Sequence, residues 1–176
     1  MLGSMLPVLE LFLRILLAII FAGAAVSKLR NIGEFHGVVR NFKLLPEALD
    51  GIFASSLPWV ELAIAGFLLV GSGLHRYAGA AAGLLLFVFA IAMAVNIVRG
   101  RREIDCGCFR DGLRQELSWL LVARNVVLAA AALFVASQEA PATMAFANVA
   151  LASAAAAISI VLYFSAVQLQ ALRQKA

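Results

Sequence analysis

Residues 77–98 read YAGAAAGLLLFVFAIAMAVNIV, a stretch of apolar and small side chains without one charged residue. A helix rises about 1.5 Å per residue, so about 20 apolar residues cross the hydrocarbon layer of a bilayer, which is about 30 Å thick. The stretch is therefore expected to be a transmembrane helix.

Further stretches of the chain meet the same criterion on either side of it. They run from about 8 to 27, 58 to 74, 118 to 137 and 143 to 167. Only a few residues separate the span that ends near 74 from the one that begins at 77, so these two should form a tight antiparallel hairpin. The sequence predicts an all-α integral membrane helical bundle with five spans, formed by a single domain over residues 1–176.

The composition excludes a soluble protein. Hydrophobic residues make up 64% of the chain and charged residues 14%, and the mean hydropathy is +0.98. A soluble domain has about 45–50% apolar and about 25% charged residues, so most of this chain must face lipid. The net charge of +4 does not indicate nucleic acid here, because the placement of the charges matters more than their sum. The expected surroundings are the lipid bilayer.

The basic residues predict the orientation in the membrane. One face of the bundle should carry Lys28, Arg30, Arg40, Lys43, Arg99, Arg101, Arg102, Arg110, Arg114, Arg173 and Lys175. Arg76 stands alone at the opposite face. Lys and Arg accumulate in cytoplasmic loops, so we expect an inner-membrane protein with its N-terminus outside and its C-terminus in the cytoplasm.

A short amphipathic helix is predicted between the first two spans, over residues 33–45. Phe35, Val38, Val39 and Phe42 follow the spacing of one helix stripe, and Pro46 should end the helix. Such a helix is expected to lie in the inner interface as a membrane anchor, with a lid over a site as the alternative.

Small residues and charges inside the spans suggest how the helices pack. Gly66, Gly79 and Gly83 are interpreted as sites of close helix approach. Glu10 and Arg14, one helical turn apart, are expected to form a structural ion pair in the outer leaflet.

The cysteines of the chain are the most informative chemical feature. Cys106 and Cys108 flank Gly107 in the polar link that follows residue 98. A structural disulfide would close so short a loop that it would add little stability. A redox pair agrees better with the neighbouring Arg101, Arg102 and Arg110, because cations lower the pKa of a thiol. Asp105 opposes this effect but could take up a proton during exchange.

Two other interpretations of the cysteines remain open. Thiolates suit a soft ion such as Cu(I), although the sequence offers no third ligand, and two cysteines with two histidines do not suggest a zinc site. The chain could also be a non-enzymatic scaffold or transport subunit in which the thiols are inert.

Several polar residues are expected in the same leaflet as the cysteines. They are Ser27, Lys28, Glu61, Asn96, Arg124 and Asn125. In one interpretation Glu61 and Arg124 form a charge pair that joins two helices, while Lys28 extends to the surface. In the other they form a polar pocket beneath the cysteine loop, because ionisable residues within a membrane are costly and often functional.

Several motifs resemble those of a known family. The segment AGAAVSKL at 22–29, Leu45-Pro46, Pro58 and Glu61-Leu62 resemble the DoxX-like superfamily. The segment DCGCF at 105–109, followed by Arg124-Asn125, resembles the MauE family of methylamine-utilisation membrane proteins within it. The resemblance covers about residues 8–137 and implies a DoxX-like four-helix core with a fifth transmembrane helix. Arg110 stands where the family usually has glycine.

The resemblance also implies a function and partners. The family is associated with maturation of a disulfide-rich periplasmic dehydrogenase subunit alongside a thioredoxin-like protein. Cys106 and Cys108 would then be the catalytic redox pair, with Lys28, Glu61 and Arg124 around them. A quinone acceptor is conceivable by analogy with other membrane thiol oxidases. Periplasmic clients would require the cysteines on the outer side of the membrane, whereas the loop charges predict them on the inner side. We base the predicted orientation on the loop charges.

Overall fold

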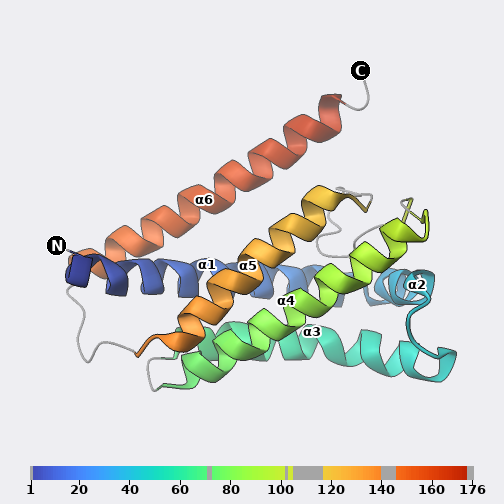
Figure 1. Cartoon of the computed structure of the whole chain (residues 1–176), viewed down its shortest axis with the longest axis horizontal. Helices are drawn as coiled ribbons and strands as arrows, with labels where there is room; N and C mark the ends of the chain where they lie inside the picture. Colours follow the sequence, from blue (N-terminus) through green and yellow to red (C-terminus); the bar gives the residue numbers. More distant parts are fainter. Residues whose placement is uncertain (1, 71–72, 102, 105–116, 140–145, 174–176) are drawn as a thin grey trace.

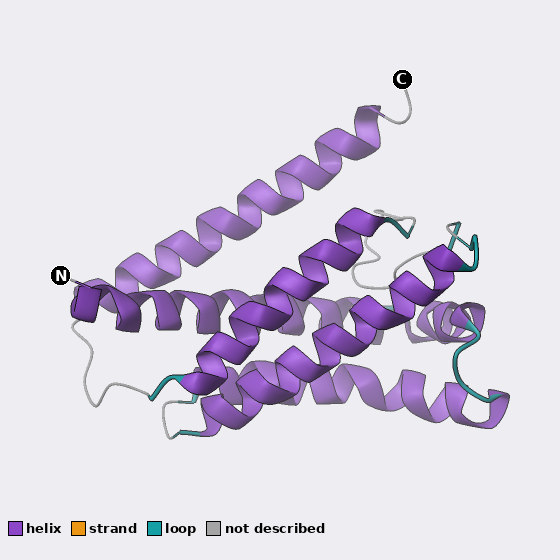
Figure 2. Cartoon of the chain, viewed as in Figure 1, coloured by secondary structure: helices purple, strands orange, loops and turns teal. Residues whose placement is uncertain are grey.

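The computed structural model describes residues 2–70, 73–101, 103–104, 117–139 and 146–173, and these residues are helical apart from short connections (Figure 2). The helices are α1 (Leu2–Arg30), α2 (Ile32–Phe42), α3 (Glu47–Leu69), α4 (Leu74–Val98), α5 (Trp119–Ser137) and α6 (Phe146–Arg173). The all-α class predicted from the sequence is confirmed.

Four of the described helices are long and apolar enough to cross a bilayer. They are α1, counted over Leu6–Arg30, and α3, α4 and α5 over their full lengths. Within α6 the side chains that the structure describes form an apolar stretch over Val149–Leu162. Many large apolar side chains of these helices are exposed on the outside of the bundle, as they would be in contact with lipid. The chain is therefore a multi-pass membrane protein.

Successive long helices run in alternating directions (Figure 1). The core between these helices is a cluster of buried apolar residues from α1, α3, α4 and α5, which includes Leu17, Phe21, Leu68, Leu86 and Val135. Because the helices alternate in direction, the first turns of α1 lie at the same end of the bundle as the α3–α4 hairpin. The last turns of α1 lie at the other end with α2 and the end of α4 (Figure 1).

The short second helix packs against protein, which corrects the expectation of a simple membrane anchor. Phe35, Val38 and Val39 are buried together with Ala54 and Leu57 of α3. The helical stripe was thus identified from the sequence, but α3 covers it instead of lipid. We attribute this to the length of α3, which provides an additional apolar surface beside α2.

Pro46 and Pro58 have roles in α3 that differ from the expected ones. α2 ends at Phe42, and its C-cap Lys43 has a left-handed backbone conformation with φ of 49°, so Pro46 does not end this helix as expected. Pro46 is the N-cap of α3, so this helix begins at Glu47 and includes Pro58 in its interior. The span had been expected to begin near 58. Glu47 and Asp50 in the first turn favour the earlier start, because acidic side chains stabilise the N-terminus of a helix.

Two glycines of α4 allow a close approach to α5. A Cβ atom on Gly79 would lie 2.9 Å from the carbonyl oxygen of Ala132, and one on Gly83 would lie 3.0 Å from the side chain of Leu133. This confirms the interpretation of Gly79 and Gly83 as packing sites. The same interpretation of Gly66 is wrong, since a Cβ there would meet nothing within 4 Å.

The last helix contacts the bundle along α1 and then leaves it. Ala152 and Ala156 are buried, and α6 packs mainly on α1. Its C-terminal half diverges from the other helices (Figure 1). This divergence leaves α6 as one wall of a side cavity in the bundle.

Candidate functional site

A buried ion pair joins the end of α1 to the middle of α3. The Nζ atom of Lys28 lies 2.7 Å and 2.8 Å from the two carboxylate oxygens of Glu61. The Lys28 and Glu61 side chains are only 3% and 2% exposed. The expectation that Lys28 extends to the surface is therefore wrong, because the carboxylate holds its ammonium group inside the bundle.

The same ammonium group also contacts the short second helix. Lys28 Nζ lies 5.4 Å from the centre of the Phe35 ring, within the range of a cation–π interaction. Since Phe35 belongs to the apolar stripe packed on α3, one lysine connects α1, α2 and α3. This junction fixes the position of the charge pair.

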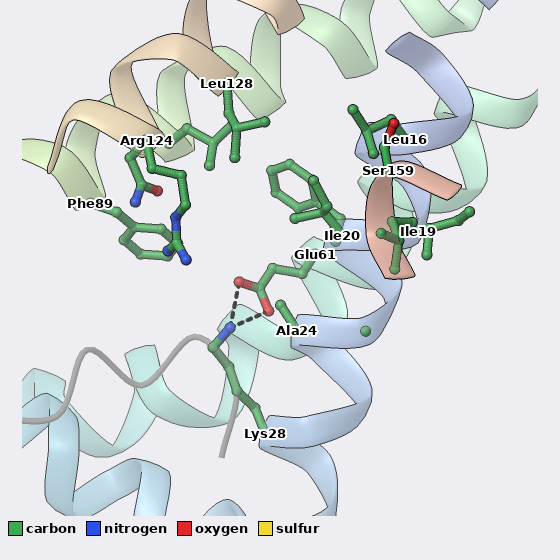
Figure 3. Close-up of a pocket in the computed structure, with 15 residues that line it drawn as sticks. Leu16, Ile19, Ile20, Ala24, Lys28, Glu61, Phe89, Arg124, Leu128 and Ser159 are labelled. Atoms are coloured by element: carbon green, nitrogen blue, oxygen red, sulfur yellow. Dashed lines mark hydrogen bonds and ion pairs between the residues drawn. The ribbon is translucent and has the colours of Figure 1, made fainter. Parts of the chain in front are cut away.

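Two polar residues of α5 face this pair across a cavity. Arg124 points toward Lys28 and Glu61 (Figure 3). Asn125 is buried, and its side-chain amide donates a hydrogen bond of 2.9 Å to the carbonyl of Leu121. The structure thus brings four of the predicted site residues, Lys28, Glu61, Arg124 and Asn125, around one space.

The cavity itself has a volume of about 280 Å³ and is mostly apolar. Its wall also includes Leu16, Ile19, Ile20, Phe21, Gly23, Ala24, Leu86, Phe89, Leu128, Ser159 and Ile160. The charged and amide groups therefore gather in a site otherwise built from aliphatic and aromatic side chains. The pocket interpretation predicted such an arrangement from the polar residues, but not its apolar extension.

Asn96 and Arg101 form a separate connection at the end of α4. Arg101 donates a hydrogen bond of 3.2 Å to the Oδ1 atom of Asn96 and others of 2.6 Å and 3.5 Å to the carbonyls of Asn41 and Phe42. The final carbonyls of a helix lack partners within it, and a cation there is favourable. Arg101 thus fastens the end of α4 to the end of α2, a role that the sequence did not suggest.

The remaining predicted site residues lie outside the described part of the chain. These are Arg102, Asp105, Cys106 and Cys108. In the chain they lie between the end of α4 and the start of α5, which are at the same end of the bundle (Figure 1). Within the described residues no group of three or more His, Cys, Asp or Glu side chains could hold a metal ion.

A second buried polar cluster, partly missed by sequence reasoning, lies at the other end of the bundle. The predicted pair is present, with Arg14 Nη1 3.3 Å from Glu10 Oε1. His75 of α4 joins it, with Nε2 3.8 Å from the same oxygen. The His75 side chain is fully buried, and its ring nitrogens have no hydrogen-bond partner among the residues described. In the sequence, only the position of His75 at the start of a spanning helix could have indicated that it joins this cluster.

In this cluster Arg14 also donates hydrogen bonds to carbonyls at the C-terminal end of α3. Its Nε atom donates to the carbonyl of Leu68 at 2.8 Å, and Nη2 to the carbonyl of Val70 at 3.4 Å. The guanidinium therefore serves carbonyls that the helix leaves unpaired as well as the carboxylate of Glu10. This geometry supports the structural role expected for the pair.

Comparisons with known proteins agree with the resemblance seen in the motifs. The family model for methylamine utilisation protein MauE matches residues 6–138. A protein of that name from Methylorubrum extorquens is 47% identical over 173 residues, covering 97% of this chain and 91% of its own. A namesake from Paracoccus denitrificans is 53% identical over 131 residues, covering 74% and 70%. No solved structure matches the chain.

Proposed function

Because the chain belongs to the MauE family of methylamine utilisation proteins, we propose that it is a membrane thiol–disulfide redox protein acting on a protein of the methylamine dehydrogenase system. The observation that carries this proposal is the Cys106-Gly107-Cys108 segment, which contains both cysteines of the chain. A thioredoxin-like protein or a disulfide-containing dehydrogenase subunit would be the partner.

The proposed chemistry is an exchange of one disulfide for another. The thiolate of one cysteine attacks a client disulfide, which forms a mixed disulfide and releases one client thiolate. The second cysteine then attacks the mixed disulfide, so the client leaves as a dithiol and Cys106–Cys108 becomes the disulfide. The reverse sequence oxidises a client dithiol, and both directions conserve electrons and protons.

The arrangement of the helices supports this chemistry at one end of the bundle. The link that carries the cysteines begins after α4 and ends before α5, and Arg124 lies on α5 near that end. The buried Lys28–Glu61 pair lies with Arg124 around the same cavity. Basic side chains at this end would stabilise a thiolate, which is the reactive form.

Complementation tests the proposal. A methylotrophic strain that lacks its own MauE relative should grow on methylamine with this chain but not with C106S/C108S. A single variant, C106S or C108S, should accumulate a mixed disulfide with the partner that is released by reductant. Full growth with C106S/C108S at equal membrane abundance would instead indicate a scaffold or transport subunit and reject the redox role.

A further inference from the structure

The side cavity of the bundle has the shape and chemistry of a site for a lipid-soluble ligand. It extends along α1 from Leu16 to Lys28, about 18 Å of helix at about 1.5 Å per residue. Its volume of about 280 Å³ far exceeds the water-sized voids of a packed protein interior. It is close to the lower limit of small-molecule sites, about 300 Å³, and so can hold a head group and the first part of a chain.

The polar residues of the cavity are restricted to a few side chains, which defines the head group. Arg124 contributes its guanidinium, and Lys28 contributes an ammonium that also binds both oxygens of Glu61. Glu61 and Asn125 line the same part of the cavity. The N–H donors of Arg124 and Lys28 favour a ligand atom that accepts hydrogen bonds, such as a carbonyl or carboxylate oxygen. Phe89 lies beside Arg124 and offers a flat apolar surface to such a head group (Figure 3).

The rest of the wall selects the tail. Leu16, Ile19 and Ile20 of α1 and Leu128 of α5 are aliphatic, so a polar or sugar-like body would lose its hydration there without new hydrogen bonds. Ile19 of the membrane-spanning helix α1 lines the cavity and is 42% exposed. A ligand would therefore enter sideways from the hydrocarbon layer.

We propose that this cavity binds an amphipathic lipid-soluble molecule, with its hydrogen-bond-accepting head at Lys28 and Arg124 and its apolar tail along α1 toward Leu16. Two sources share this chemistry, an isoprenoid quinone and a fatty acyl lipid of the bilayer. The inference does not require the cysteines to react, so it remains open to test if the redox proposal fails.

A matched pair of α6 variants tests the site in nanodiscs of defined phospholipid. Ser159 lines the cavity, so S159F would fill part of it, whereas Ile158 is 59% exposed outside it and I158F is the control. The probes are decylubiquinone, measured as the amount retained above protein-free nanodiscs, and a photoreactive fatty acid, measured by its crosslinked residues. Wild type and I158F should bind equally, and S159F should bind at least tenfold less.

The probes distinguish the two sources. Saturable retention of decylubiquinone that S159F removes would identify a quinone-type ligand. Crosslinking of the fatty acid to the cavity wall that S159F removes, without quinone retention, would identify an acyl lipid. Equal signals in S159F and I158F for both probes would overturn the proposal.

A second pair on α5 covers the case in which S159F does not fold. Leu128 lines the cavity and Val127 beside it is 67% exposed, so L128F and V127F repeat the comparison from the opposite wall. Binding should also persist in C106S/C108S. Loss of growth in C106S/C108S together with unchanged binding would separate the ligand site from the thiol chemistry.

Discussion

The Lys28–Glu61 pair is buried between α1 and α3, with Phe35 of α2 beside it, so each charge stabilises the other. E61Q leaves the ammonium of Lys28 buried without its carboxylate. Removing one partner of a buried ion pair costs about 3–5 kcal/mol. We expect E61Q to lower the free energy of unfolding by about that amount, measured by denaturant titration in detergent micelles.

The double variant K28M/E61Q is the matched control for this prediction. With neither charge of the pair left, it should recover most of the stability that E61Q loses, because the buried ammonium is removed together with the carboxylate. A loss of less than about 1 kcal/mol in E61Q, the value typical of exposed pairs, would contradict the buried geometry.

Arg14 binds one carboxylate and two backbone carbonyls. A side chain with fewer N–H donors than arginine cannot make all three contacts. R14M leaves Glu10 without its cation and the end of α3 without its donors. R14K restores a positive charge but not the planar guanidinium. We expect the melting temperature in detergent to fall in both variants, and further in R14M than in R14K. Equal melting temperatures for R14K and wild type would indicate that charge alone suffices.

Individual contacts were predictable where they are local in the chain. Glu10 and Arg14 are one turn apart on a single helix, so their pairing follows from spacing. The contact between Lys28 and Glu61 was not predictable in this way, because it depends on the rotation of α1 relative to α3, which apolar helices of uniform composition do not specify. His75 was missed for the same reason, since its neighbours come from a helix more than sixty residues away.

At the scale of the helix, the α4–α5 contact depends on a missing side chain. A Cβ atom on Gly79 would lie 2.9 Å from a backbone oxygen and 3.0 Å from a backbone nitrogen of α5, and neither can move without the helix. G79A should therefore lower the free energy of unfolding by about 1–3 kcal/mol, the usual cost of overpacking. Denaturant titration in detergent would measure it.

G66A provides the comparison on α3. A Cβ there meets nothing within 4 Å, and alanine favours helix over glycine, so G66A should be neutral or slightly stabilising. If the two variants had equal stability, the close approach of α4 and α5 would be disproved.

The helices themselves were largely predictable because long apolar runs allow few alternatives in a membrane. The start of α3 was not, because proline can end a helix, begin one or lie within one. Pro46, expected to end the preceding helix, caps the start of α3, and Pro58, expected to begin the span, lies within it. The stripe of α2 was correctly recognised, but hydrophobic spacing indicates only which face is buried. It does not distinguish lipid from a neighbouring helix as the covering surface.

For the whole molecule, the charge distribution predicts which end faces the cytoplasm. With both native cysteines replaced by serine, a new cysteine at exposed Glu139 tests the end that should be outside, and one at exposed Leu44 tests the basic end. In intact cells a membrane-impermeant maleimide should label E139C and leave L44C unlabelled until lysis. The opposite pattern would reverse the orientation and place the cysteine link on the periplasmic side.

The cavity could be anticipated only in part from the whole sequence. Polar residues expected in one leaflet do converge on it, because alternating helices bring the same depth of each span to the same level. Its apolar extension depends on the angle at which α6 leaves α1, and an alanine-rich helix can pack at many angles (Figure 1).

The hydrogen bonds of Arg101 to Asn41 and Phe42 have a mechanical consequence. Arg101 immediately precedes the link that leads to Cys106, so the base of this link is tied to the tip of α2. A force that displaces α2, for example from a docking partner, would be transmitted through the guanidinium to that base. A displacement of α2 would therefore also move the C-terminal end of α4, to which Arg101 is bonded through Asn96.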